Sequence, residues 1–259
     1  MAIADHCSDE DGLAFKVLHS TKGVEYCGVS VLPGSTIGDR LREAIRSMNQ
    51  QGVHVGILPE LTMLPELLQI ARDTTCEVHD AARGTNSLRV LVAGSLHEPS
   101  GELVKNISHV IAGDGSLLWV QEKMSPFAWT VSEAPHQEAL DTRTRVLRVC
   151  DLWFGRTVVA ICLDYLVEVV QQASIDLAVS CFLVPAMTPG TREFKKMAMD
   201  YVRATQAGSL VANAYLQTPP PERDGGASFA SRPKRGSEDE VLTTFGVRPG
   251  PYVDVFRVG

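Results

Sequence analysis

The sequence predicts a layered α/β fold, and three observations support that prediction. The chain has 259 residues, of which 44% are hydrophobic, so it is long enough to bury a sizeable core as one domain. Its first third alternates apolar runs with amphipathic segments, the βαβαβ order of an α/β sheet. Later segments read as pairs of strands. We expect one domain over 1–259, with a loose segment at 1–13 and a surface loop at 217–240.

Strands and helices alternate in the first third. Strands are expected at 26–33, 53–58 and 88–95, and a helix over 65–82 separates the last two. Ser35 is a helix N-cap candidate because its hydroxyl can accept a hydrogen bond from the first turn. The helix after it repeats apolar residues with helical period: Ile37, Leu41, Ala44, Ile45 and Met48. These elements predict a sheet with helices packed on it.

Paired strands dominate the rest of the chain. Gly113-Asp114-Gly115 supplies the positive φ angles of a tight hairpin turn, and no helix N-terminus follows to receive a phosphate. Helices are expected at 167–174 and 191–207, the second with Phe194 and Tyr201 on one apolar face. The remaining strands are expected at 106–112, 116–121, 144–150, 156–161, 177–184, 209–215, 241–247 and 251–258.

Composition narrows the class of protein. A net charge of -7 argues against nucleic acid or an anionic membrane as partner, because such binding relies on basic surface. The N-terminus does not read as a signal peptide, and no apolar run approaches the ~20 residues of a membrane span. The six cysteines occur singly, without metal-ligand spacing. We therefore expect a cytoplasmic protein that acts on a small molecule without metal or cofactor.

Three apolar runs end in groups able to do chemistry. Glu60 follows the strand at 53–58, Lys123 follows the strand at 116–121, and Cys162 follows the strand at 156–161. Taken singly, each has an ordinary interpretation: a core cysteine, an exposed carboxylate and a surface lysine. Cys150 and Cys181 keep that core interpretation. The joint pattern of a thiol, a carboxylate and an ammonium at strand ends favours a nucleophilic site.

This pattern resembles the carbon–nitrogen hydrolase family, or nitrilase superfamily, whose members carry Glu, Lys and Cys in that chain order at strand ends. The resemblance runs from about residue 14 to the C-terminus. Further segments carry it: Gly94-Ser95, Asn106, Gly113-Asp114-Gly115-Ser116, Val184-Pro185-Ala186, Arg203-Ala204 and Val211-Ala212-Asn213-Ala214. It implies a four-layer αββα sandwich of two mixed β-sheets with helices on the outer faces, and a homodimer.

The resemblance also implies a mechanism, which agrees with the general needs of acyl transfer. Cys162 would attack the substrate carbon, and Glu60 would take and return the proton. Lys123 would stabilise the charge that develops, together with the backbone N–H of Leu163. Water would then release the thioester and yield an acid with ammonia or an amine.

A second glutamate in the family positions substrate and lysine, and we expect Glu133 in that role, with Glu138 as the alternative. Asp164 is expected to hold the turn after Cys162 by accepting hydrogen bonds from backbone N–H groups. Four histidines read as scattered structural residues and support no Cys–His dyad: His54, His97, His109 and His136.

The substrate class stays open at this point. The segment 163–168 lacks the aromatic–Pro–Glu pattern common in the family, so the pocket wall there is expected to differ. An amide or carbamoyl compound is preferred to a nitrile. Two other functions remain: a catalytically quiet member that binds a ligand or regulates a partner, and a soluble acyltransferase that uses an amine acceptor.

Overall fold

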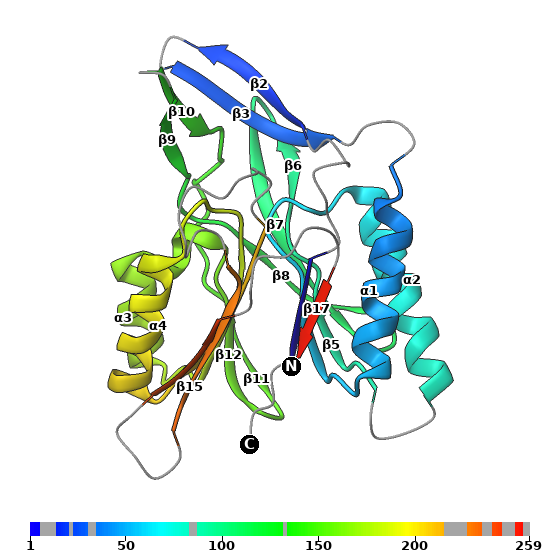
Figure 1. The fold of residues 1–259 in the computed structure, drawn as a ribbon. Coiled ribbons are helices and arrows are strands. Elements are labelled where there is room, and N and C mark those ends of the chain that lie inside the picture. The colour runs from blue at the N-terminus through cyan, green and yellow to red at the C-terminus, as the bar shows by residue number, and fades with distance from the viewer. Residues whose placement is uncertain are drawn as a thin grey trace.

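Two mixed β-sheets packed face to face, with a pair of helices outside each, build the molecule (Figure 1). This is the four-layer αββα sandwich that the resemblance implied. The computed structural model describes residues 1–5, 14–20, 23–30, 35–82, 87–131, 134–214, 227–234, 240–244 and 252–255.

The first sheet has seven strands, and its centre is parallel. Strands β1 and β4 pair in parallel, as do β4 and β5, while β17 and β7 add antiparallel neighbours. Strand β7 also pairs with β6 and β8. In spatial order the strands are β17 (Tyr252–Val255), β1 (Ala2–Asp5), β4 (Val55–Ile57), β5 (Val90–Val92), β7 (Leu103–Ala112) and β6 (Leu96–Ser100), with β8 (Leu117–Glu122) beside β7.

The second sheet has six strands and again a parallel centre. Strand β13 pairs in parallel with β12 and β14, and the flanking pairs are antiparallel. In spatial order the strands are β11 (Val149–Leu152), β12 (Gly155–Val159), β13 (Cys181–Ala186), β14 (Gly208–Asn213), β15 (Phe229–Pro233) and β16 (Glu240–Thr244).

Both faces of the first sheet are covered. Helices α1 (Ile37–Gln50) and α2 (Pro65–Ala82) lie against its outer face, where Leu91 of β5 belongs to their apolar cluster. Val90 and Val92 point the other way, into the cluster between the sheets. Burial on both faces explains why these strands read as continuous apolar runs.

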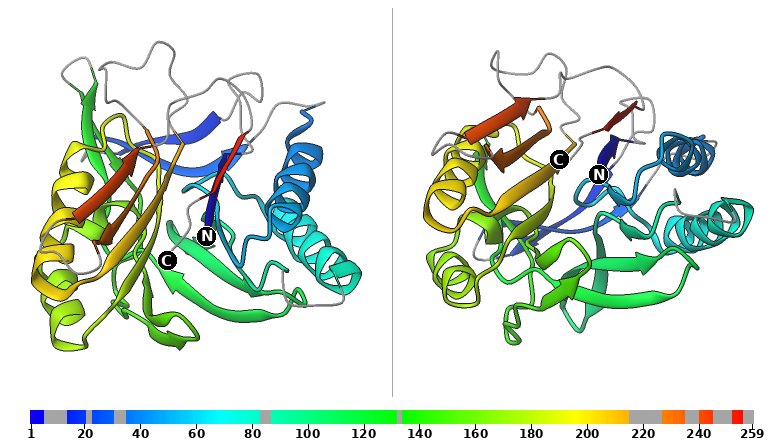
Figure 2. Two further views of the ribbon diagram at one scale, coloured as in Figure 1. Left: turned by 60° about the horizontal axis from the view of Figure 1, so that its bottom comes forward. Right: turned by 90° about the horizontal axis from the view of Figure 1, so that it is seen from below.

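Helices α3 (Glu168–Asp176) and α4 (Arg192–Thr205) cover the second sheet (Figures 1 and 2). The predicted apolar face of α4 is confirmed: Phe194 and Tyr201 are buried, and the ring of Tyr201 lies 4.2 Å from that of Phe182 on β13. Aromatic packing of this kind contributes beyond the area that it buries.

A small third sheet, absent from the prediction, lies at one end of the sandwich (Figure 1). The hairpin of β2 (Ala14–Ser20) and β3 (Gly23–Ser30) pairs through β3 with β10 (Ala134–Glu138), which pairs with β9 (Ala128–Val131). The β3–β10 pairing is parallel and joins segments more than 100 residues apart in the chain, so no local pattern could predict it.

Two predicted segments are wrong in part. The loose segment expected at 1–13 instead contributes β1, which lies between β4 and β17. Within the loop expected at 217–240, residues 227–231 are buried and β15 joins β14 to β16. Both strands are short, and their small or polar residues become strand-forming only when distant partners supply the ladder. Residues 6–13, 217–226 and 235–239 lie outside the described residues.

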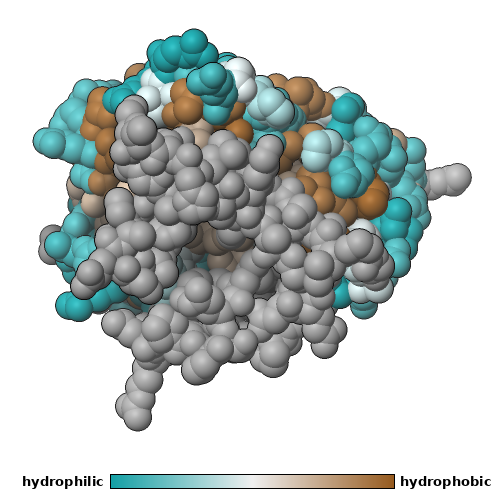
Figure 3. Space-filling view, turned by 90° about the horizontal axis from the view of Figure 1, so that it is seen from above, coloured by the Kyte–Doolittle hydropathy of each residue, from teal (hydrophilic) through white to brown (hydrophobic). Residues whose placement is uncertain are grey.

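No helix in the described ranges is both long and apolar enough to cross a membrane. Figure 3 shows the molecule from above. Small groups of hydrophobic residues alternate with hydrophilic ones around the edge of this face.

Candidate active site

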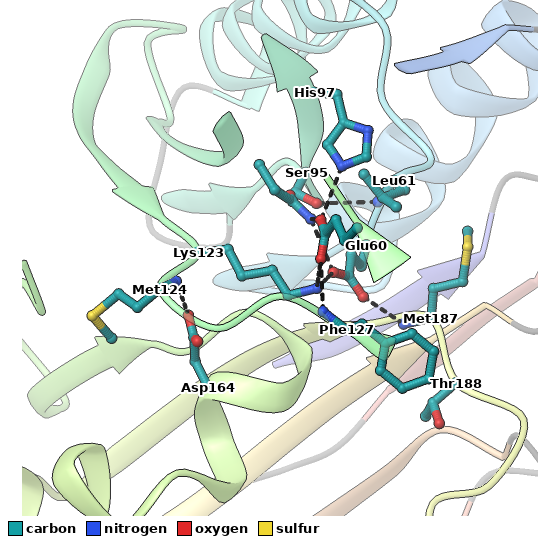
Figure 4. A network of polar contacts seen from close by, with 12 residues as sticks. Glu60, Leu61, Ser95, His97, Lys123, Met124, Phe127, Asp164, Met187 and Thr188 are labelled. Carbon is teal, nitrogen blue, oxygen red and sulfur yellow. Dashed lines mark hydrogen bonds and ion pairs between the residues drawn. The ribbon is translucent and has the colours of Figure 1, made fainter. Parts of the chain in front are cut away.

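A buried ammonium between two carboxylates forms the centre of the site (Figure 4). Lys123 Nζ lies 2.7 Å from Glu60 Oε1 and 2.6 Å from Glu138 Oε2. None of the three residues is more than 2% exposed. Each follows or ends a strand: β4 precedes Glu60, β8 precedes Lys123, and β10 ends at Glu138. Buried charges of this kind persist only when they are paired and hydrogen-bonded.

Glu60 lies in the loop after β4, and hydrogen bonds from other elements hold its side chain in place. Its Oε1 also accepts a hydrogen bond from Asn106 Nδ2 at 3.0 Å, and its Oε2 accepts one from the backbone N–H of Met187 at 3.0 Å. Gly94 has a φ of +55°, and a Cβ there would collide with the carbonyl oxygen of Pro59. Next to it, Ser95 Oγ accepts a hydrogen bond from the backbone N–H of Leu61. The Gly94-Ser95 pair therefore shapes the turn that presents Glu60.

A second loop, after β13, carries Met187 to the site. Asn213 at the end of β14 accepts a hydrogen bond from the backbone N–H of Thr188 and donates one to its carbonyl oxygen, both at 2.9 Å. The hydroxyl of Ser228 in turn accepts a hydrogen bond from the backbone N–H of Asn213 at 3.0 Å. This chain of bonds holds the backbone that donates to Glu60.

Glu138 accepts hydrogen bonds from four donors. Besides Lys123, they are His97 Nε2 at 2.9 Å, Asn106 Nδ2 at 2.8 Å and the backbone N–H of Phe127 at 3.2 Å. Burial opposes ionisation of this carboxyl, but the charge of Lys123 and the contact with His97 outweigh burial and lower its pKa to about 2. Glu138 is therefore a carboxylate at neutral pH.

Cys162 begins a short 3-10 helix, η2 (Cys162–Leu166). This helix follows β12, which ends at Val159. Cys162 is 2% exposed and has a φ of +49°, a left-handed conformation uncommon outside glycine. Leu61, beside Glu60, is also left-handed at 55°. Strained backbone of this kind costs about 1–3 kcal/mol per residue and clusters at functional sites.

The thiol of Cys162 interacts directly with this cluster. Burial raises its pKa well above the usual value and the charge of Glu60 raises it further, while Lys123 and a hydrogen bond from the backbone N–H of Met187 act in the opposite direction. The resting group is therefore a thiol, and Glu60 is the carboxylate that influences it and could take its proton as the sulfur attacks.

Asp164 connects the cysteine turn to the lysine strand. Its Oδ2 accepts a hydrogen bond from the backbone N–H of Met124 at 2.9 Å, directly after Lys123. The predicted hydrogen bond to a backbone N–H is present, but its donor follows β8 and lies outside the turn after Cys162, so the bond joins two segments. Burial raises the pKa of Asp164 to about 6, against the opposing effects of the Met124 N–H and the Lys123 charge.

The structure brings together most of the predicted site residues. Glu60, Lys123 and Cys162 meet in one buried cluster, and Glu138, the alternative candidate for the second glutamate, lies on the lysine. Glu133 lies outside the described residues.

Sequence reasoning missed His97, which read as one of several scattered histidines. The β6–β7 hairpin pairs His97 with Asn106 in direct register, a signal that becomes visible only once that hairpin is aligned.

The structure also shows where two other cysteines lie and whether any described side chains could hold a metal ion. Burial raises the pKa of Cys181 to about 12, as expected of a core thiol. Cys150 is half-buried on β11 and also unpaired. Among the residues that the structure describes, no group of three or more His, Cys, Asp and Glu side chains is arranged to hold a metal ion.

The sequence matches no family model and no curated protein. Its fold is similar to that of solved structures of nitrilase-superfamily amidases. The NitN amidase from Nesterenkonia sp. AN1 is 18% identical over 99% of this chain and 93% of its own, with a TM-score of 0.62.

Two variants of the same Nesterenkonia amidase are similar to the same degree. One carries the acetamide moiety of fluoroacetamide covalently at its active-site cysteine; it is 18% identical over 98% of this chain and 89% of its own, with a TM-score of 0.63. The other is a complex with acrylamide, 17% identical over 98% and 89%, with a TM-score of 0.62. At these identities the likeness establishes the fold.

Proposed function

We propose that this chain belongs to the carbon–nitrogen hydrolases and hydrolyses a small-molecule amide or carbamoyl compound through a thioester on Cys162. The observation that carries the proposal is the buried contact of Lys123 with Glu60 beside a thiol held in a left-handed turn. The structural neighbour with an amide-derived group on its active-site cysteine supports an amide in preference to a nitrile.

In the first half of the reaction, Cys162 Sγ bonds to the carbonyl carbon as its proton passes to Glu60. The carbonyl oxygen becomes an oxyanion, and the Lys123 ammonium stabilises it. The backbone N–H of Leu163 supplies a second donor, since it lies in the first turn of η2, where amides have no intrahelical acceptor. The carbon–nitrogen bond then breaks, and Glu60 returns the proton to the leaving nitrogen.

In the second half, water attacks the thioester carbon and gives its proton to Glu60. The carbon–sulfur bond breaks, the acid leaves, and the thiol recovers its proton from Glu60. Glu138 accepts no proton in this scheme; it holds Lys123 opposite Glu60. The homodimer and the cytoplasmic location stay predictions.

The test combines turnover with detection of the covalent intermediate. We expect ammonia release from at least one compound in a panel of short amides, carbamoyl amino acids and nitriles. Fluoroacetamide should add an acetamide group to Cys162, which peptide mass spectrometry would locate. Cys162→Ala should abolish both signals while its far-UV circular dichroism stays unchanged. Cys150→Ala is the matched control, because it removes an unpaired cysteine outside the cluster.

The possible outcomes separate the alternatives. Ammonia release without loss in Cys162→Ala removes the proposed nucleophile. An adduct on Cys162 without acid product, but with amide formed from an added amine, identifies acyl transfer. Neither adduct nor ammonia from any compound favours the catalytically quiet, ligand-binding interpretation.

A further inference from the structure

His97 is a buried histidine whose contact with the site lies outside the proposed chemistry. It lies on β6, its side chain is 1% exposed, and its Nε2 lies 2.9 Å from Glu138 Oε1. We propose that His97 is a positioning residue that holds Glu138 as a fully hydrogen-bonded carboxylate and through it aims the Lys123 ammonium. This inference rests on the proposed function, because it assigns a task within that site.

The sheet register places two donors on one carboxylate oxygen. His97 on β6 and Asn106 on β7 are direct cross-strand partners, so their side chains point to the same face. Asn106 Nδ2 lies 2.8 Å from the same Glu138 oxygen and 3.0 Å from Glu60 Oε1. The hairpin thus presents two donors to Glu138, and Asn106 also links Glu138 to Glu60 on the other side of the lysine.

The acceptor capacity of Glu138 is used completely. A carboxylate offers about four lone-pair sites. Oε1 accepts from His97 and Asn106, and Oε2 accepts from Lys123 and the backbone N–H of Phe127. No site remains for an N–H of the substrate unless one of these bonds breaks. In this chain Glu138 therefore acts on the lysine and leaves substrate binding to other groups.

The charge of Glu138 determines the direction of the His97 hydrogen bond. An ionised carboxylate only accepts, so His97 Nε2 carries a hydrogen and donates it. Without this donor the pKa of Glu138 would rise, although the charge of Lys123 would still oppose the effect of burial, and the carboxylate would be held less firmly against the ammonium. Among the described side chains, Lys123 is the other titratable group that contacts Glu138. Lys123 in turn interacts with three further titratable groups: Glu60, Cys162 and Asp164.

The experiment compares two substitutions at one position. His97→Leu removes the donor, whereas His97→Gln keeps an N–H at a similar distance from the backbone. His109→Leu is the matched control, because it removes a second His–Glu pair on the same sheet, 3.8 Å from Glu98 and outside the cluster. Each variant is assayed for kcat and KM with the best amide from pH 3 to pH 9. Alkylation of Cys162 by iodoacetamide is followed by mass spectrometry over the same range.

We expect His97→Leu to lower kcat about 10-fold at pH 6, the effect of losing one hydrogen bond to a charged group, with KM changed less than about 2-fold. The loss should grow below about pH 4, because the pKa of Glu138, about 2 in the wild type, should rise by about one unit without His97. His97→Gln should recover most of both effects. His109→Leu should match the wild type.

Three results would overturn the inference. One is an equal loss of kcat at all pH values in His97→Leu, which would indicate a purely structural role. Another is a rise in KM alone, which would indicate contact with substrate. The third is an unchanged pH dependence of Cys162 alkylation. If the wild type releases no ammonia, the proposed function fails, and the alkylation experiment then decides the role of His97.

Discussion

Replacing Lys123 with methionine keeps an unbranched side chain but removes the charge between Glu60 and Glu138. At an effective dielectric constant of about 20, each contact near 2.7 Å is worth about 6 kcal/mol of Coulomb attraction, part of which desolvation offsets. Breaking a buried pair by removing one partner typically costs about 3–5 kcal/mol. We expect Lys123→Met to lower the free energy of unfolding at pH 8 by that amount.

The loss should depend on pH with a definite sign. In the wild type, the folded-state pKa of Glu138 is about 2, against an ordinary value of 4.5, so its pairing stabilises above pH 4.5 and is lost as pH falls toward 2. In the variant, burial raises the pKa of Glu138 without the charge of Lys123 to oppose it, so the penalty is complete above that raised value and shrinks as pH falls. The difference between the two proteins should therefore be largest at pH 8 and smaller at pH 4.5.

Urea unfolding at pH 8, 6 and 4.5 measures this difference. The matched control is Lys105→Met, because Lys105 on β7 pairs with Glu122 at 3.2 Å while 33% of its side chain is exposed. Such a pair is worth about 1 kcal/mol or less. Equal losses in the two variants, or a loss in Lys123→Met that does not change with pH, would refute the argument.

Three further predictions concern stability and use denaturant unfolding. Gly94→Ala should lower the free energy of unfolding by about 2 kcal/mol or more, because the added Cβ would meet the Pro59 carbonyl oxygen. Its control is Gly101→Ala, which should cost about 1 kcal/mol because Gly101 is left-handed but has open space around it. Equal costs in the two variants would contradict the clash. Burial raises the pKa of Asp164 from 3.8 to about 6, so the wild type loses stability as pH rises through this range. The free energy of unfolding of Asp164→Asn should therefore increase relative to the wild type by on the order of 2–3 kcal/mol from pH 4 to pH 7. A difference that stays constant with pH would contradict this. Phe182→Ala should cost about 3–5 kcal/mol, because its buried ring contacts two tyrosine rings; a cost below about 1 kcal/mol would contradict that packing.

The positions of Glu60, Lys123 and Cys162 could be predicted because each follows an apolar strand long enough to recognise in the sequence. Strands of one layer end at the same edge, so the order of elements was sufficient to bring a carboxylate and an ammonium together. The bounds of α2, Pro65–Ala82, were predicted for the same reason, since its apolar period extends over many turns.

The second glutamate could not be chosen from the sequence. Glu133 and Glu138 lie in the same polar stretch, and the position of Glu138 depends on β10 pairing with β3, more than 100 residues away. His97 posed a similar problem. A single histidine carries no period, and the side to which it points follows only from its register with Asn106. β1 was missed because four residues give too few positions to establish alternation.

The site takes groups from all three sheets. Lys123 and Glu60 follow strands of the seven-stranded sheet, Cys162 follows the six-stranded sheet, and Glu138 ends a strand of the small third sheet. A partly folded chain with one sheet missing lacks either the thiol, the lysine or the carboxylate that holds it. During refolding, covalent labelling of Cys162 by an amide reagent should therefore appear with the last sheet to form, so that reactivity reports completion of the whole fold.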